Sequence, residues 1–432
     1  MDERPDEIEE RLAALTPEQR ELLALRARKR RIEKRPVELP VEDQAPRLEV
    51  PPAPDRHVEP RAADLPTHSP PGRAGALDFS LFFFSDDGGR AGGEKYRLLF
   101  AAARLADCAG FDAVWTPERH FQDFGGLYPN PALLSAALLA STERIAIRAG
   151  SLVLPLHDPV RVVEDWSLLD NLAPGRVGLS LAAGWHPHDF ALAPAAYERR
   201  RDLVWSGVEE VRQIWRDGRA RRVAGNGEEI EIRVLPRPLS PTLPLWLTSS
   251  GSLGTWRKAG ELDTGILSAV HGDPAGDLAE RIALYRATRE ERGHDPRGGR
   301  VTSMLHTYVG DDRNAVEALV RRPMVRYFRT FLEQGRALDL RGFGIEGAAP
   351  NERDFDDLAA FAFGRYFAGR SLLGDRESCL ACLDVLHRAG VDEVACLVDF
   401  GLPEAEVLAG LERLVELRGE HARRAALSRA AP

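Results

Sequence analysis

Eight short apolar runs with strand character alternate with helical patterns from residue 77 onward, and this alternation limits the fold more than any other feature. The first run is DFSLFFFS, the third is RIAIRAGSLVL and the last is EVACLVDF. Strands that alternate with helices form parallel sheets. Eight such units over this length favour a closed (β/α)8 TIM barrel with insertions over an open sheet. The sequence therefore predicts an α/β fold.

Two segments interrupt the alternation and are predicted to be insertions. RRVAGNGEEIEIRVL has the pattern of a β-hairpin that turns at Asn226-Gly227, a dipeptide favoured in two-residue turns. Residues 336–370 form the other insertion, ahead of the last strand and helix. The barrel domain is expected to occupy residues 77–421.

The first 76 residues differ in composition from the barrel. Residues 1–35 predict a single helix, in which Thr16 caps a segment that begins with Pro17 and ends in a basic cluster. Residues 36–76 contain closely spaced prolines, which predicts a disordered or extended linker.

The bulk composition excludes several classes of function. A net charge of −9 gives no electrostatic basis for binding nucleic acid. No run of about 18 apolar residues could span a membrane, and the acidic start lacks the apolar core of a secretory signal. Four cysteines are too few for a disulfide scaffold in a chain of 432 residues, so a cytoplasmic protein is expected.

Polar residues follow three consecutive strands, at the end where a parallel barrel builds its active site. Glu118, Arg119 and His120 follow the second strand, and Glu118 could pair with Arg119 or with Arg144. Gly150 and the adjacent Ser151 end the third strand and allow a ligand to approach the backbone closely. The fourth strand ends in small residues and a tryptophan, which suit a flat aromatic ligand. Histidines also follow these strands, at positions 157 and 186.

The loop after the fifth strand has the features of a phosphate site. Ser250, Gly251 and Ser252 precede a helix that begins at about Leu253. Backbone N–H groups and hydroxyls at a helix N-terminus bind phosphate. Three arginines at positions 199–201 begin the preceding long helix and offer guanidinium groups as a second clamp for a dianion. The alternative is a capped helix that binds nothing.

Three other patterns do not predict a site. His186, His188 and Asp189 lie close together, but no further residues have ligand spacing and His-Pro-His restricts the backbone poorly for chelation, so no metal is predicted. Cys379 and Cys382 belong to an amphipathic helical segment and are predicted to be core residues. The glycine pairs after the first strand do not form GxGxxG, so a nicotinamide site is unsupported.

The order and spacing of these motifs resemble the luciferase-like, flavin-dependent monooxygenases over roughly residues 77–420. The shared motifs are LFFFS, TPERHF, LYPNP, VLPLHDPVR, EDWSLLDN, GRVGLSLAAGWHPHDF and TSSGS. LHTYVG, FGRYF and GVDEVACLVDFG resemble the subgroup associated with nonribosomal peptide and polyketide assembly lines. The resemblance implies a TIM barrel that binds reduced FMN (FMNH2), reacts it with O2 and oxygenates a substrate.

The resemblance also assigns roles to the strand-end residues. Gly150-Ser151 matches a segment that lies under the isoalloxazine ring and often carries a non-prolyl cis peptide, and Asp189 matches a carboxylate near the flavin pocket. The residues that match the ring edge are Ala182, Ala183, Gly184 and Trp185. Those that match the phosphate site are Ser250, Gly251, Ser252 and Leu253, joined by Arg200 or Arg201.

One position departs from the family pattern. Bacterial luciferases carry two adjacent histidines where this chain has Arg119-His120, and the first of those histidines is the catalytic base. Here the base is His120, His157 or His186, or Arg119 acts electrostatically on reduced oxygen instead of accepting a proton. Light emission with an aldehyde is not predicted.

We therefore expect a two-component FMN-dependent monooxygenase that receives FMNH2 from a separate flavin reductase. It would hydroxylate a natural-product intermediate, free or tethered to a carrier protein, and form a homo-oligomer. Residues 1–35 resemble docking helices of peptide synthetases; they either dock to an assembly-line protein or form a solvated helix without a partner. Phe79, Phe83 and Trp185 are expected to shield the flavin from water. The alternatives are an F420-dependent dehydrogenase on the same barrel and a non-catalytic flavin-binding or interaction protein.

Overall fold

The computed structural model describes residues 76–84, 95–122, 125–270, 273–335 and 352–430. The predicted helix at residues 1–35 and all but the last residue of the predicted linker at 36–76 lie outside the described residues. Within the described ranges, no helix is both long enough and apolar enough to cross a membrane.

Eight parallel strands close into a barrel, which confirms the predicted (β/α)8 fold. Each strand pairs with the next along the chain up to β9, and β11 lies between β9 and β1 and closes the ring. The pairs Asp78 with Glu393 and Phe82 with Leu397 set the register of that closing seam. The strands are β1 (Asp78–Phe82), β2 (Ala113–Thr116), β3 (Ala146–Val153), β4 (Val177–Ala182), β7 (Leu245–Ser249), β8 (Gly265–Ala269), β9 (Val301–Gly310) and β11 (Glu393–Leu397).

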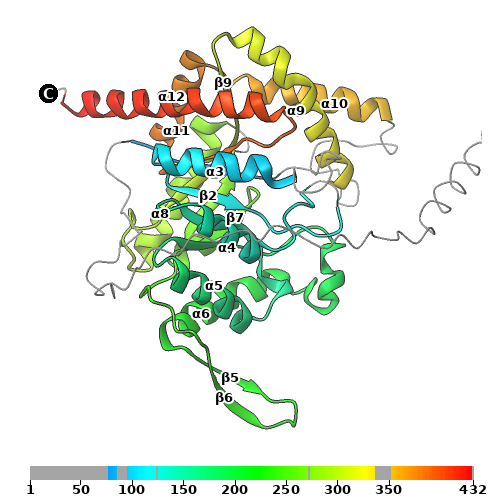
Figure 1. The fold of residues 1–432 in the computed structure, drawn as a ribbon, viewed down its shortest axis with the longest axis vertical. Helices are drawn as coiled ribbons and strands as arrows, with labels where there is room; N and C mark the ends of the chain where they lie inside the picture. Colours follow the sequence, from blue (N-terminus) through cyan, green and yellow to red (C-terminus); the bar gives the residue numbers. More distant parts are fainter. Residues whose placement is uncertain (1–75, 85–94, 123–124, 271–272, 336–351, 431–432) are drawn as a thin grey trace, which may run out of the picture. The chain divides into compact units, whose positions relative to one another are not determined.

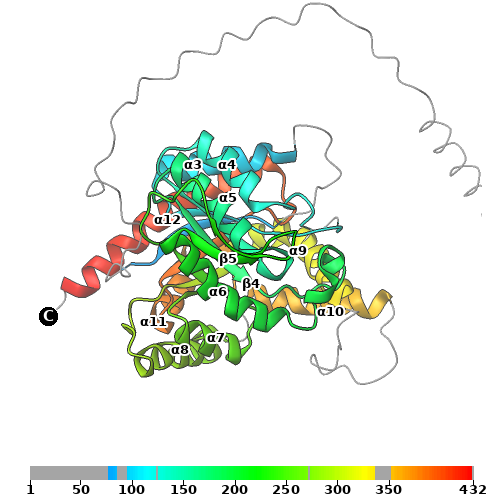
Figure 2. The ribbon, with the colours of Figure 1, turned by 90° about the horizontal axis from the view of Figure 1, so that it is seen from below.

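Helices follow the barrel strands and surround them, as Figures 1 and 2 show. Local sequence sets the starts of two of these helices. Asn130 and Asp158 each stand directly before a proline in the first turn, and their side chains accept a hydrogen bond from a backbone N–H group of that turn. Cys379 and Cys382 are buried in α11, as predicted. The helices are α3 (Arg97–Ala109), α4 (Pro131–Ser141), α5 (Pro159–Leu172), α6 (Arg200–Asp217), α7 (Leu253–Glu261), α8 (Ala279–Glu291), α9 (Arg313–Gly335), α10 (Glu352–Phe367), α11 (Arg376–Ala389) and α12 (Glu404–Ala430).

A β-hairpin of β5 (Arg219–Val223) and β6 (Glu229–Arg233) extends from the barrel at the lower edge of Figure 1. The hairpin was predicted, but its turn is not a two-residue turn. Ala224 O accepts a hydrogen bond from Gly227 N–H at 2.9 Å, and Ala224 N–H donates to Glu228 O at 2.8 Å. Residues 225–227 therefore form a three-residue loop. Gly227 takes a positive φ of 86°, which matches the twist of the two strands at this loop length.

A larger insertion separates β9 from β11. Helices α9 and α10 lie side by side in both ribbon views, and Arg329 of α9 pairs with Asp356 of α10 at 2.7 Å. Strand β10 (Leu372–Asp375) then pairs with the end of β9. The insertion predicted at residues 336–370 is therefore only part of this segment, and residues 336–351 lie outside the described ranges.

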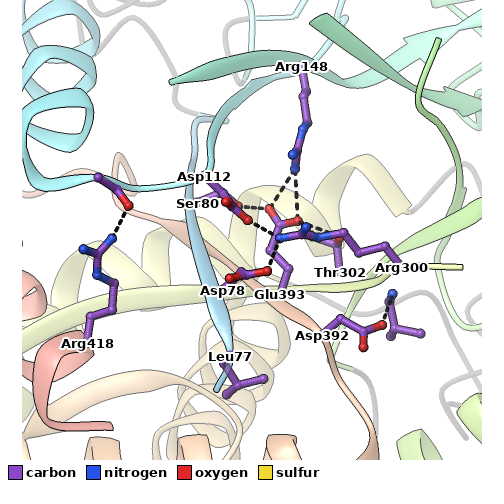
Figure 3. Close-up of polar contacts among 12 residues, drawn as sticks. Leu77, Asp78, Ser80, Asp112, Arg148, Arg300, Thr302, Asp392, Glu393 and Arg418 are labelled. Atoms are coloured by element: carbon purple, nitrogen blue, oxygen red, sulfur yellow. Dashed lines mark hydrogen bonds and ion pairs between the residues drawn. The ribbon is translucent and has the colours of Figure 1, made fainter. Parts of the chain in front are cut away.

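Buried charge fills the N-terminal end of the barrel interior. Figure 3 shows Arg148 and Arg300 approaching the Glu393 carboxylate from two sides, with ion-pair distances of 3.0 and 2.6 Å. Above this group, the rings of Trp115 and Trp246 meet edge to face with centroids 5.1 Å apart. The base of the barrel is thus closed by side chains, and only the C-terminal end, the mouth, is left to receive a ligand.

Candidate active site

Hydroxyl groups from three neighbouring strands meet at the mouth. Thr248 Oγ1 of β7 lies 2.6 Å from Ser180 Oγ of β4 and also forms a hydrogen bond with Ser151 Oγ of β3. Ala182 lies two residues after Ser180, on the same face of β4. Ser151, Ala182 and Thr248 each keep part of their surface exposed, although they end strands of a closed barrel. Ser151, Ala182 and Thr248 form an accessible surface of small side chains, the mouth floor, against which a flat ligand can lie, and the buried Ser180 supports it from below.

The Gly150-Ser151 peptide beside the mouth floor is cis, as the family resemblance implies. The strand ladder slips at this point, because Gly150 pairs with Ser180 whereas Leu152 pairs with Leu181. A Cβ atom at Gly150 would come within 2.9 Å of the Phe82 ring and 3.0 Å of Trp115. Only glycine fits at this position without displacing the barrel interior.

Glu118 is buried at the mouth and holds two histidines. Its Oε1 lies 3.1 Å from His120 Nε2 and 2.6 Å from His157 Nε2, and its Oε2 accepts a hydrogen bond from Val153 N–H at 2.6 Å. Burial opposes the charged carboxylate, but these hydrogen bonds outweigh it and lower the pKa of Glu118. Burial likewise opposes a charged His157, yet its hydrogen bond and attraction to Glu118 raise the pKa of His157.

The sequence did not predict this arrangement. The sequence left a pairing of Glu118 with Arg119 or Arg144 open; Arg144 instead donates to Asp107 O at 2.9 Å, and the carboxylate contacts His120 and His157. The available signal was the spacing of Glu118 and His120, because residues two apart in an extended segment point to the same side. His157 follows from no local pattern, since it reaches Glu118 across 39 positions of the chain.

Arg119 is buried between two aromatic rings. Its guanidinium carbon lies 5.6 Å from the ring centroid of Phe84 and 5.2 Å from that of Trp185. Burial lowers the pKa of Arg119 in spite of the attraction of Asp189. Burial also raises the pKa of Asp189 in spite of the attraction of Arg119 and His186, and Asp189 Oδ1 has no hydrogen-bond partner among the described residues.

His186 belongs with Arg119 and Asp189 rather than with Glu118. Its ring centroid lies 5.3 Å from that of Trp185, and its Nδ1 accepts a hydrogen bond from His188 N–H at 3.3 Å. Burial, together with the positive charge of Arg119, lowers the pKa of His186. The four candidate catalytic residues therefore fall into two adjoining groups. Among the described residues, no three His, Cys, Asp or Glu side chains are arranged to hold a metal ion.

The predicted phosphate loop lies at the start of α7. Ser252 is the N-cap residue but its hydroxyl caps no backbone N–H, and Gly251 takes a positive φ of 104°. Helix α6 runs alongside α7 in the same direction, because Trp205 contacts Lys258 and Arg212 donates to Leu262 O. The two helices thus begin at the same end.

The two arginines at the start of α6 differ in their contacts. Arg200 donates to Tyr197 O at 2.6 Å, and its guanidinium carbon lies 4.2 Å from the centre of the Tyr197 ring. Arg201 is exposed. Arg201 lies one helical turn before Trp205, which contacts Lys258 of α7, so Arg201 is on the face of α6 that is turned toward α7.

Two of the three residues expected to shield the site point elsewhere. Ser80 reaches Glu393 inside the barrel, so alternate residues of the same segment, Phe79 and Phe83, face the surrounding helices. The Phe79 ring indeed packs 6.4 Å from those of Phe111 and His421. Phe84, on the inward face, is the phenylalanine of this segment that contacts Arg119.

His306 is a buried mouth residue that sequence reasoning missed. It lies on β9 and its ring contacts those of Tyr327, Tyr366 and Phe400, with centroids 4.4, 5.4 and 5.5 Å away. Its motif, LHTYVG, was recognised only as part of a family pattern. The distant aromatic partners come from the insertion and from the loop after β11, which the local sequence does not connect to β9.

Comparison with known proteins agrees with this geometry. Residues 77–393 match the family described as luciferase-like monooxygenase. The alkanal monooxygenase alpha chain of Photorhabdus luminescens is 34% identical over 341 residues, which cover 74% of this chain and 90% of that protein.

Two solved structures share the fold. The oxygenating constituent of 3,6-diketocamphane monooxygenase from the CAM plasmid of Pseudomonas putida, in complex with FMN, has a TM-score of 0.62 at 19% identity and covers 80% of this chain and 98% of that one. An F420-dependent secondary alcohol dehydrogenase has a TM-score of 0.59 at 16% identity and covers 79% and 99%.

Proposed function

The chain belongs to the luciferase-like monooxygenase family, and we propose that within this family of flavin-dependent enzymes it is a two-component FMN monooxygenase. It would take FMNH2 from a separate reductase and use O2 to hydroxylate a natural-product intermediate. The solved relative described as an oxygenating constituent with bound FMN supports a division between oxygenase and reductase.

The mouth floor is the observation that carries the FMN proposal. Ser151, Ala182 and Thr248 present small, partly exposed side chains at three neighbouring strand ends, which suits contact with a flat three-ring system. Gly150 and Ser151 would lie under the isoalloxazine, and Ala182, Ala183, Gly184 and Trp185 would lie along its edge. Gly184 takes a positive φ of 72°, and a Cβ atom there would come within 2.8 Å of Val153, so the turn leaves no room for a side chain.

The start of α7 would hold the phosphate of FMN. The loop Ser250, Gly251, Ser252 and Leu253 is largely exposed and precedes a helix N-terminus, where N–H groups favour an anion. Arg201, beside it on α6, would supply the guanidinium fork.

Replacing Arg201 by Ala should weaken FMN binding about tenfold, as expected for loss of one charge-assisted hydrogen bond. Equal FMN affinity of R201A and the unmodified protein, measured by fluorescence titration, would contradict this assignment.

The protein's own contribution is to hold protons and stabilise charge. Bound FMNH2 would supply the electrons that activate O2. Glu118 orients His120 and His157 so that their Nε2 atoms both face Oε1. His157, with 32% of its side chain exposed, can exchange its proton with solvent, whereas His120 is deeper. Arg119, held between Phe84 and Trp185, would stabilise negative charge on reduced oxygen. Burial keeps His186 neutral near pH 7, so it would act as a hydrogen-bonding group.

The proposed test mixes the protein with FMNH2 without oxygen, admits O2 and follows the absorbance of oxidised flavin. Bound flavin should reoxidise more slowly than flavin in buffer, because the aromatic side chains and Arg119 exclude water from the mouth. Equal rates with and without protein would overturn the monooxygenase proposal.

The F420-dependent dehydrogenase stays a second candidate, because a solved enzyme of that kind shares the fold. Its distinguishing property would be hydride transfer without oxygen. Tight binding of F420 combined with no effect on flavin reoxidation would favour this candidate over the FMN monooxygenase.

We also propose that residues 1–35 dock the enzyme to an assembly-line protein, and that the barrel forms a homo-oligomer. The assembly-line motifs support the first idea. Deleting residues 1–75 should leave the reaction of FMNH2 with O2 unchanged but impair turnover of a carrier-bound substrate. Equal turnover of that substrate by both forms would contradict docking.

A further inference from the structure

His306 lies at the top of the barrel interior. Thr302 donates to Glu393 inside the barrel, so Met304 and His306, on the same face of β9, also point inward. Met304 is level with Ala269, the last residue of β8. His306 is level with Leu397, which ends β11. His306 therefore lies where a substrate above the mouth floor would be.

Tyr366 fixes which nitrogen of His306 carries the proton. Its hydroxyl oxygen accepts a hydrogen bond from His306 backbone N–H at 3.1 Å and lies 2.9 Å from His306 Nδ1. Among the described residues, Nδ1 is the acceptor available for the Tyr366 hydroxyl proton. Nδ1 must then be unprotonated, and the proton of the neutral ring is on Nε2.

This Nε2–H group is a buried donor that the described residues do not satisfy. His306 is 4% exposed, and its Nε2 has no hydrogen-bond partner among the described residues. Burial lowers the pKa of His306 to about 3, so the ring is neutral at physiological pH and does not act as a base. Buried donors without an acceptor are rare in native proteins and point to a missing ligand or water.

The surroundings of His306 indicate the chemistry of that ligand. Aromatic rings of Tyr327, Phe328, Tyr366 and Phe400 surround the imidazole, with centroids 4.4–6.4 Å away. Met304, Tyr327 and Phe328 keep part of their surface exposed, so His306 lies one layer of side chains below accessible surface. Arg119, a buried cation, interacts electrostatically with Tyr327 and so borders the same space.

We propose that His306 Nε2–H donates a hydrogen bond to a carbonyl oxygen of the substrate, whose apolar, ring-containing body packs among these aromatic side chains. The inference rests on the proposed function and specifies its substrate as a cyclic or aryl ketone or acyl compound. His306 positions the substrate and Tyr366 positions His306. The chemistry at the flavin side needs no contribution from either residue.

Ligand binding without flavin tests this proposal directly. We would titrate the full-length protein with acetophenone and ethylbenzene, and with 2-acetylnaphthalene and 2-ethylnaphthalene, so that each ketone has a partner of the same shape without the oxygen. At least one ketone should bind about tenfold more tightly than its partner, as one well-made hydrogen bond predicts. H306F should remove this preference, whereas H306Q, which keeps an N–H donor near the Nε2 position, should retain most of it.

Histidine-selective ¹⁵N NMR gives a second, structural readout. In the unmodified protein, the His306 signals, assigned by their loss in H306Q, should show a proton on Nε2 only, and the bound ketone should shift that N–H. In Y366F, both tautomers should be populated and the ketone preference should weaken. A proton on Nδ1, equal binding of ketones and hydrocarbons, binding of neither, or a preference that persists in H306F would each overturn the proposal.

The flavin assay separates this proposal from the proposed function. FMN affinity and FMNH2 reoxidation are measured for the same variants without any ketone, and normal FMN binding also shows that H306F and H306Q are folded. Absence of ketone discrimination in the unmodified protein, together with a normal flavin reaction, rejects only the role of His306. Ketone discrimination in a protein that does not react with FMNH2 rejects the monooxygenase instead.

Discussion

The barrel holds a buried glutamate at each end, and the two have partners of opposite kinds. Glu393 at the base contacts Arg148 and Arg300, whose charge is permanent at any physiological pH. Glu118 at the mouth contacts two histidines, and histidine is the residue type that ordinarily gains or loses charge near neutrality. The base therefore holds a cluster whose charges do not change with pH, whereas the mouth holds residues of a type that can exchange protons.

The hydrogen bonds around the two carboxylates reinforce this contrast. Glu393 also accepts from Trp115 Nε1 at 3.2 Å and from Thr302 Oγ1 at 3.2 Å, and the surrounding charges and donors lower its pKa to about 2 although burial opposes this. Its side chain is fully buried, while His157 beside Glu118 remains partly exposed. The same residue type would thus serve stability at the base and, under the proposed function, chemistry at the mouth.

Neutralising Glu393 should have the largest effect on stability. In E393Q, Arg148 and Arg300 would stay buried with their main counter-charge removed, and breaking a buried pair in this way costs about 3–5 kcal/mol. Urea denaturation of both proteins at pH 7 measures this loss. E231Q is the matched control, because Glu231 pairs with Arg219 on the exposed hairpin and should contribute less than about 1 kcal/mol. A loss below about 1 kcal/mol in E393Q would show that the base is not a stabilising cluster.

The same change at Glu118 should affect the reaction more than the fold. In E118Q the side chain that His120 and His157 both contact is neutral, so neither histidine has a carboxylate beside it to stabilise a proton on its ring. We expect the reoxidation rate of bound FMNH2 to change by about tenfold at pH 7, and its pH profile to move to lower pH because His157 loses the group that raises its pKa. Stopped-flow absorbance between pH 5.5 and 8.5 measures both.

His188 provides the control for that experiment. Its side chain is exposed and contacts His186, not Glu118, so H188Q should not move the pH profile in the way that E118Q does. An E118Q profile that coincides with that of the unmodified protein would mean that the two histidines take no part in the reaction.

The two ends also differ in how far the sequence reveals them. Strand alternation predicts the barrel, and short motifs predict Gly150-Ser151 and the Asp189 segment, because these depend on neighbouring residues. Glu393 and Arg148, in contrast, are 245 positions apart, and only barrel closure brings them together. Partners of His306 likewise come from separate segments. A pattern of residue types along the chain holds no information on such pairings, so the sequence did not identify His157 as a partner of Glu118.

The smallest expected difference between the two ends is in how the free energy of unfolding depends on pH. Because the pKa of His157 is raised above its ordinary value of 6.5, its pairing with Glu118 stabilises fully below that value and fades as pH rises through the raised pKa. The pKa of Glu118 is lowered from 4.5, so its contribution is present above 4.5 and fades as pH falls through the lowered pKa. The Glu118–His157 pair should therefore stabilise most between these two ordinary values.

The pKa of Glu393 is also lowered, and its arginine partners do not titrate in this range, so its contribution to stability should be constant from pH 5.5 to 8.5. The stability lost in E118Q should then shrink by about 0.5–1 kcal/mol between pH 6 and pH 8.5, a small change because His157 is about one-third exposed. The loss in E393Q should not vary over that range. Urea denaturation of the three proteins at both pH values tests this, and a parallel change in the two variants would mean that the Glu118–His157 pair titrates no differently from the fixed charges at the base.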